Sequence, residues 1–428
     1  MTRPWTSPAA QRREHEIVEL IDGRSPAELD GMVWEWIREN RAIHEDECIN
    51  LDPAANVMNP RAEHALAAGL SSRPSLGWPG DKYETGLEAI EAIEVVAAQL
   101  AQRVFGARFA EIRVPSGAIG NLYSFMATCS PGDAVIVPPP SIAGHVTHQR
   151  NGAAGLYGVE VHHAPIDAEH YTIDVAALAE LVARVHPKLV TVGGSLNLFP
   201  HPVREVADIA HAAGAKVLYD AAHVSGLLAG RQWPNPLDLG ADIISMSTYK
   251  SLGGPAGGLL LTNDESLAAR LDAIAYPGLT ANFDAGVAAA LAISLLDWVE
   301  HGTAYASAFV ANGAALAAEL IRLGLPVFTT PLGPTSSHQL AIVADQWGGG
   351  DAAAHSVRRA NLLASAIGLP AGSGLRLGTS EATRWGMGPT EMAEIAALVQ
   401  RGLGGDPTTA ADTTALKQRH RTVHFVRA

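Results

Sequence analysis

Residues 219–226 read Y-D-A-A-H-V-S-G, and residues 246–254 read M-S-T-Y-K-S-L-G-G. A short apolar run precedes each stretch, as is typical of a buried parallel strand. Polar residues that directly follow such strands lie at the sheet edge that carries ligands in α/β proteins. One strand end therefore supplies the acid Asp220 and the imidazole His223, and the next supplies Lys250. The two stretches predict an α/β fold with a ligand site at this edge.

A lysine and an acid on neighbouring strand ends suit one organic cofactor in particular. Pyridoxal 5'-phosphate (PLP) is held through a lysine Schiff base, and an acid pairs with its pyridinium nitrogen. Lys250 and Asp220 are the candidates for these two roles. We therefore expect a PLP site.

The two stretches resemble the serine hydroxymethyltransferases, which are fold-type-I PLP enzymes. The family pattern is V-D-x-A-H-x-A-G-L, followed by T-T-T-H-K-T-L-x-G-P-R-G-G. The resemblance runs from about residue 50 to residue 386. It implies a large domain with a mostly parallel seven-stranded sheet flanked by helices, and a smaller C-terminal α/β domain. It also implies that Lys250 forms the Schiff base, Asp220 holds the pyridinium nitrogen and His223 lies beside them.

Further cofactor contacts follow from the same resemblance. Residues 115–121 read P-S-G-A-I-G-N, where the family has H-S-G-S-Q-A-N. Ser116 and Gly117 therefore match a helix start that would bind the phosphate. Ser247 and Tyr249 stand where the family has threonine and histidine, and they are the remaining candidate cofactor contacts.

Two motifs point to the cofactor ring and the substrate. Residues 141–148 read S-I-A-G-H-V-T-H and resemble the family's A-H-G-G-H-L-T-H, which implies that His145 stacks on the cofactor. His148 follows at helical spacing, but no third ligand lies nearby, so no metal site is expected. Arg376 lies in G-L-R-L-G-T-S, close to the family's G-I-R-V-G-T-P. A guanidinium matches a carboxylate in a bidentate way, so Arg376 is the candidate anchor for the substrate carboxylate.

The family pattern breaks at residues 74–86. The family has Y-x-E-G-Y-P-G-x-R-Y-Y-G-G, and this chain has P-S-L-G-W-P-G-D-K-Y-E-T-G. The family's catalytic glutamate falls on Leu76, which cannot transfer a proton. The tyrosine pair becomes Tyr83 and Glu84. We expect Tyr83 to contact the substrate, and Glu84 is either a substitute acid or a solvated charge at a helix start.

A second break lies before Arg376. The family's folate-gripping loop is reduced to residues 370–373, and its neighbouring-subunit loop P-G-G-Q-G-G becomes residues 277–282, P-G-L-T-A-N. These losses favour a folate-independent relative of the threonine aldolase or transaldolase type, acting on the Cα–Cβ bond of a β-hydroxy-α-amino acid. The β-hydroxyl needs only a base, for which the candidates are His145, His148, Glu84 and a phosphate-bound water.

Other functions remain open from the sequence. One is a folate-dependent hydroxymethyltransferase acting on serine or an α-methyl amino acid. Another is a different PLP reaction at Cα, such as transamination, racemisation or decarboxylation. A third is a cofactor-binding homologue that acts as a protein partner without catalysis.

Composition narrows the class of protein. The chain has 428 residues, of which 47% are hydrophobic and 17% charged. Its formal charge of −14 argues against nucleic acid and anionic membranes as partners. The N-terminal stretch has no signal-peptide pattern and no run of transmembrane length is evident, so we expect a cytoplasmic enzyme. The expected partners are a small amino acid and an aldehyde, and the family resemblance implies a second copy of the chain, as a homodimer or a dimer of dimers.

The domain organisation is predicted from the pattern of elements. Residues 1–50 form a helical arm with a cap at Ser25, and the family resemblance implies that this arm lies at the dimer contact. Residues 51–290 alternate between strands and helices and form the PLP-binding domain. Residues 291–405 form the small domain. Residues 406–428 are a tail that we expect to be loosely ordered.

Overall fold

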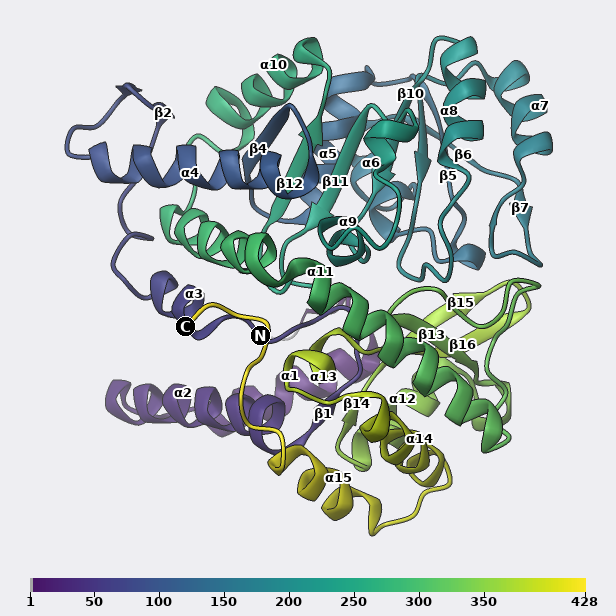
Figure 1. The fold of residues 1–428 in the computed structure, drawn as a ribbon. Helices are drawn as coiled ribbons and strands as arrows, with labels where there is room; N and C mark the ends of the chain where they lie inside the picture. Colours follow the sequence, from purple (N-terminus) through teal and green to yellow (C-terminus); the bar gives the residue numbers. More distant parts are fainter. Residues whose placement is uncertain (1–2) are drawn as a thin grey trace. The chain divides into compact units, whose positions relative to one another are not determined.

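Strands and helices alternate along the chain as the sequence predicts. The computed structural model describes residues 3–428 and contains a seven-stranded sheet in the order β4-β12-β11-β10-β9-β5-β6 (Figure 1). Its strands are β4 (Phe109–Val114), β5 (Ala134–Val137), β6 (Glu160–His163), β9 (Leu189–Val192), β10 (Lys216–Asp220), β11 (Ile243–Ser247) and β12 (Gly258–Thr262). The pairings from β6 to β11 are parallel, and β12 runs antiparallel to both of its neighbours. The prediction of a mostly parallel seven-stranded sheet is confirmed.

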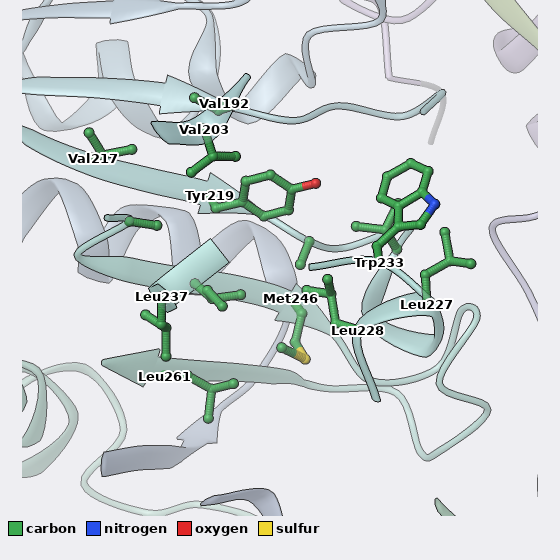
Figure 2. Packing of buried hydrophobic residues seen from close by; sticks show 14 of the residues in the cluster. Val192, Val203, Val217, Tyr219, Leu227, Leu228, Trp233, Leu237, Met246 and Leu261 are labelled. Carbon is green, nitrogen blue, oxygen red and sulfur yellow. The ribbon is translucent and has the colours of Figure 1, made fainter. Parts of the chain in front are cut away.

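Helices flank this sheet, which explains why its central strands are apolar runs. The helices are α4 (Glu88–Phe105), α5 (Gly117–Thr128), α6 (Ala153–Tyr157), α7 (Val175–Val185), α8 (Val203–Ala212), α9 (Ser225–Ala229) and α10 (Glu265–Ala273). Every residue of β9, β11 and β12 is buried, as expected for strands covered on both faces. Side chains from successive strands meet in one core, including Val192, Val217, Tyr219, Met246 and Leu261 (Figure 2).

A long helix, α11 (Ala285–Arg322), connects this sheet to a second core (Figure 1). By length and composition it is the one described helix that could cross a membrane, which sequence inspection missed. Its apolar residues belong to both hydrophobic cores, which is the behaviour of a core helix. The predicted domain boundary at residues 290 and 291 falls within this helix.

The second core belongs to a smaller α/β region. It contains an antiparallel sheet, β13 (Gln339–Val343), β16 (Gly372–Gly378) and β15 (Ser365–Leu369), with α12 (Gly350–Arg359), α13 (Ser380–Arg384) and α14 (Pro389–Leu403). The parallel pair β1 (Ile49–Asn50) and β14 (Leu362–Leu363) joins the same region. Other short elements include α3 (Pro60–Leu66), β2 (Gly77–Trp78), β3 (Asp81–Lys82), β7 (Ile166–Asp167) and β8 (Thr172–Ile173).

The expectation of a loosely ordered tail is wrong. Residues after 405 form α15 (Thr409–Gln418), which buries Thr409, Thr413 and Leu416. Lys417 is also buried, with its Nζ 3.4 Å from the centroid of the Trp385 ring. The composition of this segment is polar, so it did not indicate a buried helix face. That face consists of small threonine side chains and Leu416, together with the cation–π contact of Lys417.

Residues 3–48 form a separate unit. It contains α1 (Pro8–Ile21), α2 (Pro26–Arg41) and the π-helix η1 (Ala42–Glu47). The predicted cap at Ser25 is present as a capping box with Glu28. Neither α1 nor α2 buries any residue, and Trp34 is 55% exposed. The role of this unit at a dimer contact stays a prediction.

Candidate active site

Lys250 lies in the turn that follows β11. Its side chain is buried, and its Nζ is 3.0 Å from His223 Nε2. The turn closes through a hydrogen bond from the backbone N–H of Gly253 to the carbonyl oxygen of Lys250 (2.9 Å), and Gly253 has a left-handed φ of +67°. Burial lowers the pKa of Lys250 to about 8. More of this amine is therefore neutral, and hence nucleophilic, near neutral pH than in an ordinary lysine.

Asp220 ends β10 and is buried. Its Oδ2 accepts hydrogen bonds from His148 Nε2 (2.9 Å) and Asn121 Nδ2 (3.1 Å). Its Oδ1 accepts a hydrogen bond from the backbone N–H of Ala222 (3.0 Å). Burial alone would raise the pKa of Asp220, but the hydrogen bond and charge of His148 bring the net pKa well below the usual value. The carboxylate is therefore held ionised and oriented, as required of a partner for a pyridinium nitrogen.

His148 was a candidate base for the substrate, but its ring lies among buried groups. Its Nε2 contacts Asp220, and its Nδ1 lies 3.1 Å from Thr191 Oγ1. Both ring nitrogens are therefore engaged within the buried core. His148 orients Asp220, and the hypothesis that it takes the β-hydroxyl proton finds no support in this geometry.

Asn121 is a site residue that sequence reasoning did not single out. Besides contacting Asp220, its Nδ2 donates to Thr147 Oγ1 (2.9 Å) and its Oδ1 accepts from Ser245 Oγ (2.6 Å). The side chain thus ties α5 to β10 and β11. The sequence did contain a sign of this role. Asn121 is the last residue of P-S-G-A-I-G-N, and the corresponding family motif, H-S-G-S-Q-A-N, also ends in asparagine.

Arg376 lies on β16 and reaches the same cluster from the small region. Its Nη1 donates to the carbonyl oxygen of Ser195 (2.6 Å), and its Nε and Nη2 donate to Ser365 Oγ (3.1 and 2.8 Å). Longer contacts reach Asp52 Oδ1 (3.4 Å) and His223 Nε2 (3.5 Å). The guanidinium is therefore held in place close to Lys250, as its predicted role requires.

His223 lies between the lysine and the arginine. Its Nδ1 also lies 3.4 Å from Gln339 Nε2, so N–H groups approach the ring on both sides. Burial, followed by the charges of Lys250 and Arg376, holds the pKa of His223 well below its usual value. The ring is therefore neutral, and it can accept a hydrogen bond beside the lysine. Gln339 and Ser365 are further site residues that only the fold reveals.

The N-terminus of α5 lies against the strand that leads to Lys250. Ser116 caps this helix, and its Oγ accepts a hydrogen bond from the N–H of Ile119 (3.2 Å). A Cβ on Gly117 would lie 2.5 Å from Ser247 Oγ, so only glycine allows this approach. The helix N-terminus and the Ser247 hydroxyl form an environment that suits a phosphate.

Tyr249 lies next to Lys250, whose Nζ is 5.9 Å from the tyrosine ring centroid. Together with buried Lys250 and Asp220, these groups fit PLP.

His145 has one engaged and one unengaged nitrogen. Its Nδ1 lies 2.8 Å from Thr147 Oγ1, and no partner of its Nε2 is found within residues 3–428. Burial lowers the pKa of His145, which keeps the ring neutral. Its position two residues before Thr147, which Asn121 contacts, places it at the edge of the Asp220 network.

The structure does not bring Tyr83 and Glu84 to this cluster within one chain. Tyr83 is 83% exposed, and its N–H donates to the carbonyl oxygen of Leu76 (3.2 Å) beside the β2–β3 hairpin. Glu84 Oε2 is buried and has no hydrogen-bond partner among the described residues. The roles of these two residues stay predictions.

The segment that corresponds to the folate loop is a tight hairpin turn. Leu369 on β15 pairs directly with Gly372 on β16, so only Pro370 and Ala371 connect the strands. Tyr171 fixes this hairpin by donating its hydroxyl to the carbonyl oxygen of Gly368 (2.7 Å). Two residues are therefore the whole connection between β15 and β16.

The chain is similar in sequence and in fold to known proteins. The family model for serine hydroxymethyltransferase matches residues 27–399. An alpha-methylserine aldolase from Variovorax paradoxus is 56% identical and covers 98% of this chain and 96% of its own length. A serine hydroxymethyltransferase from Sulfolobus acidocaldarius is 38% identical over 88% of each chain. The crystal structure of L-threonine transaldolase from Pseudomonas fluorescens has a TM-score of 0.83 and 21% identity, covering 96% of this chain and 93% of that one, and supports the fold.

Proposed function

The chain belongs to the serine hydroxymethyltransferase family, and from that premise we propose that it is a PLP-dependent, folate-independent aldolase that acts on α-methylserine or a closely related α-methyl-β-hydroxy amino acid. In the reaction the Cα–Cβ bond breaks, the β-hydroxyl proton leaves, formaldehyde departs, and Cα gains a proton to give alanine. Bound PLP supplies the electron sink that makes bonds to Cα labile.

The residues around Lys250 would hold the cofactor. Lys250 would provide the amine, Asp220 would pair with the pyridinium nitrogen, and the start of α5 with Ser116 and Ser247 would bind the phosphate. His223 accepts a hydrogen bond beside the reacting amine. Arg376 binds the substrate carboxylate, which orients the Cα–Cβ bond for cleavage.

One observation supports folate independence most strongly: the two-residue turn between β15 and β16. A turn of this length offers no loop to enclose a pterin. Leu76 adds a second argument, because an apolar side chain stands where the family carries its proton-transferring glutamate. The relatives that share 49–56% of their residues with this chain over nearly its whole length carry the name alpha-methylserine aldolase, which supports the α-methyl substrate.

We assign removal of the β-hydroxyl proton to His145. Its Nε2 has no partner in residues 3–428, and its lowered pKa leaves it able to accept a proton. His148 has both nitrogens engaged, and Glu84 makes no hydrogen bond or ion pair with the Lys250 cluster of its own chain. His145→Gln should therefore lower kcat while leaving the absorbance of lysine-bound cofactor unchanged.

We also propose that the active unit is a homodimer or a dimer of dimers. The two N-terminal helices bury no residue, and Trp34 and Trp36 remain exposed on α2. Apolar side chains of this size usually find a partner surface. Light scattering should give a mass of at least two chains, whereas a fully active monomer would contradict this proposal.

The function is tested with purified protein loaded with PLP. A panel of β-hydroxy amino acids, with and without an α-methyl group, is assayed for aldehyde and for glycine or alanine, in the presence and absence of tetrahydrofolate. We expect aldehyde from the α-methyl substrates at equal rates under both conditions. Activity that requires tetrahydrofolate would support the hydroxymethyltransferase instead.

A further inference from the structure

The last six residues of the sequence, 423–428, return from α15 to the middle of α11 and to α3 (Figure 1). This segment, the strap, lies outside residues 27–399, which the family model matches. Its backbone makes specific contacts: the N–H of His424 donates to the carbonyl oxygen of Arg384 (2.7 Å), and the N–H of Arg427 donates to Asp297 Oδ1 (2.8 Å). The strap therefore binds the backbone of the buried Arg384 and the buried carboxylate of Asp297.

Asp297 on α11 and Arg384 on α13 form a buried ion pair. They are 2% and 0% exposed, and Arg384 Nη2 lies 3.5 Å from Asp297 Oδ2. Arg384 Nε and Nη2 have no hydrogen-bond partner within residues 3–428, so Asp297 provides most of the charge compensation. Burial raises the pKa of Asp297, and the backbone N–H of Arg427 is the first contact that opposes this rise. An ion pair of this kind is stable only while its hydrogen bonds are complete.

Arg384 links the Asp297–Arg384 ion pair to the turn that contains Lys250. Its Nη1 donates to the carbonyl oxygens of Gly253 and Val57, both at 2.9 Å. Gly253 closes the turn by donating to the carbonyl oxygen of Lys250. The neighbouring Trp298 donates its Nε1 to the carbonyl oxygen of Leu252 (2.7 Å). The turn that contains Lys250 is therefore fixed by hydrogen bonds from Trp298 on α11 and from Arg384 to its backbone carbonyl oxygens.

Phe425 adds an apolar cover to the same place. Its ring stacks on Tyr305, with centroids 5.3 Å apart and planes at 26°. Arg384 lies over Tyr305 as well, 5.2 Å from the ring centroid. Phe425, Asp297 and Arg384 line one small enclosed space. The strap thus shields the ion pair from water, which keeps its mutual attraction strong.

We infer that the strap is a positioning element for Lys250: it completes the Asp297–Arg384 pair, and this pair fixes the turn that presents the lysine to the cofactor. The inference rests on the proposed function only through the role of Lys250. Its structural part, the coupling of residues 423–428 to the Lys250 turn, stands independently of the reaction.

The test removes one backbone donor. Arg427→Pro deletes the N–H that reaches Asp297, and the matched control Arg427→Ala keeps this N–H and removes only the exposed ion pair with Glu300. Amide hydrogen exchange is measured at Gly253 and Gly254, whose N–H groups bond to the carbonyl oxygens of Lys250 and Thr248. The equilibrium Kd for PLP is measured from the absorbance of lysine-bound cofactor.

We expect Arg427→Pro to speed exchange at these amides and to weaken PLP binding, each by about tenfold, the effect of losing one hydrogen bond to a charged group. Arg427→Ala should match the wild type in both measurements. Phe425→Ala, a milder change, should shift both in the same direction as Arg427→Pro, so a proline variant that unfolds leaves the test intact. Wild-type exchange in Arg427→Pro, or equal effects of Pro and Ala, would overturn the inference. A wild-type chain that binds no PLP would refute the proposed function, while the exchange data would still decide the role of the strap.

Discussion

Replacing Arg376 with alanine should abolish tight binding of the amino acid without loss of the cofactor. Each terminal nitrogen of the guanidinium carries two N–H groups. One N–H of Nη1 is bonded to the carbonyl oxygen of Ser195 at 2.6 Å, and one of Nη2 to Ser365 Oγ at 2.8 Å. The other N–H on each nitrogen makes only a long contact, at 3.5 Å to His223 and 3.4 Å to Asp52. These two groups are available to both oxygens of a substrate carboxylate.

The expected magnitude follows from these two donors. A hydrogen bond between charged groups contributes about 1.5–3 kcal/mol, so two contribute about 3–6 kcal/mol. The loss corresponds to a roughly 150- to 20,000-fold weaker Kd. Binding is measured from the change in cofactor absorbance on addition of α-methylserine. Alaninol, which lacks the carboxylate, serves as the control ligand and should bind the wild type and Arg376→Ala equally.

Two results would refute this reasoning. If Arg376→Ala binds α-methylserine as tightly as the wild type, another group anchors the carboxylate. If the variant loses affinity for alaninol to the same extent, Arg376 acts on the shape of the site through Ser195 and Ser365. An unchanged cofactor spectrum and thermal unfolding curve in the variant will show that the fold is preserved.

Three other predictions concern the cofactor and the folate. Because burial lowers the pKa of Lys250 to about 8, the rate of PLP capture by the cofactor-free protein should rise with pH through about 8, and a stopped-flow midpoint near 10 would contradict this. His148→Leu removes one donor from Asp220 and should weaken PLP binding by about 1.5–3 kcal/mol, whereas an unchanged Kd would show that Asn121 alone suffices. Leu76→Glu should neither raise the rate of aldehyde release nor make it respond to tetrahydrofolate; a gain in either assay would show that the site still uses an acid there.

The strand ends were predictable from sequence because apolar runs and glycine-rich turns are local signals. The alternation of strands and helices predicted for residues 51–290 is present, for example in the succession of α7 and β9. The buried network was not predictable, since it depends on which strands become neighbours. Asn121 reaches Asp220 across 99 positions in the sequence, and Gln339 reaches His223 across 116.

His148 illustrates the same limit. Its spacing from His145 placed it near the cofactor, but only the fold shows that its ring points to Asp220 and Thr191. The C-terminal segment shows the limit of composition. Its threonines and basic residues suggested a loose tail, yet the backbone of Arg427 contacts a buried carboxylate. A backbone donor leaves no trace in side-chain composition.

We propose that this protein cleaves the Cα–Cβ bond of an α-methyl-β-hydroxy amino acid without folate. The most direct test uses α-methylserine labelled with carbon-13 in its hydroxymethyl group, followed by NMR with PLP-loaded protein and no folate present. We predict that the label appears in formaldehyde, with alanine formed in equal amount, and that Lys250→Ala forms neither. Label that remains in the amino acid until tetrahydrofolate is added, or label recovered in a keto acid or an amine, would contradict the account.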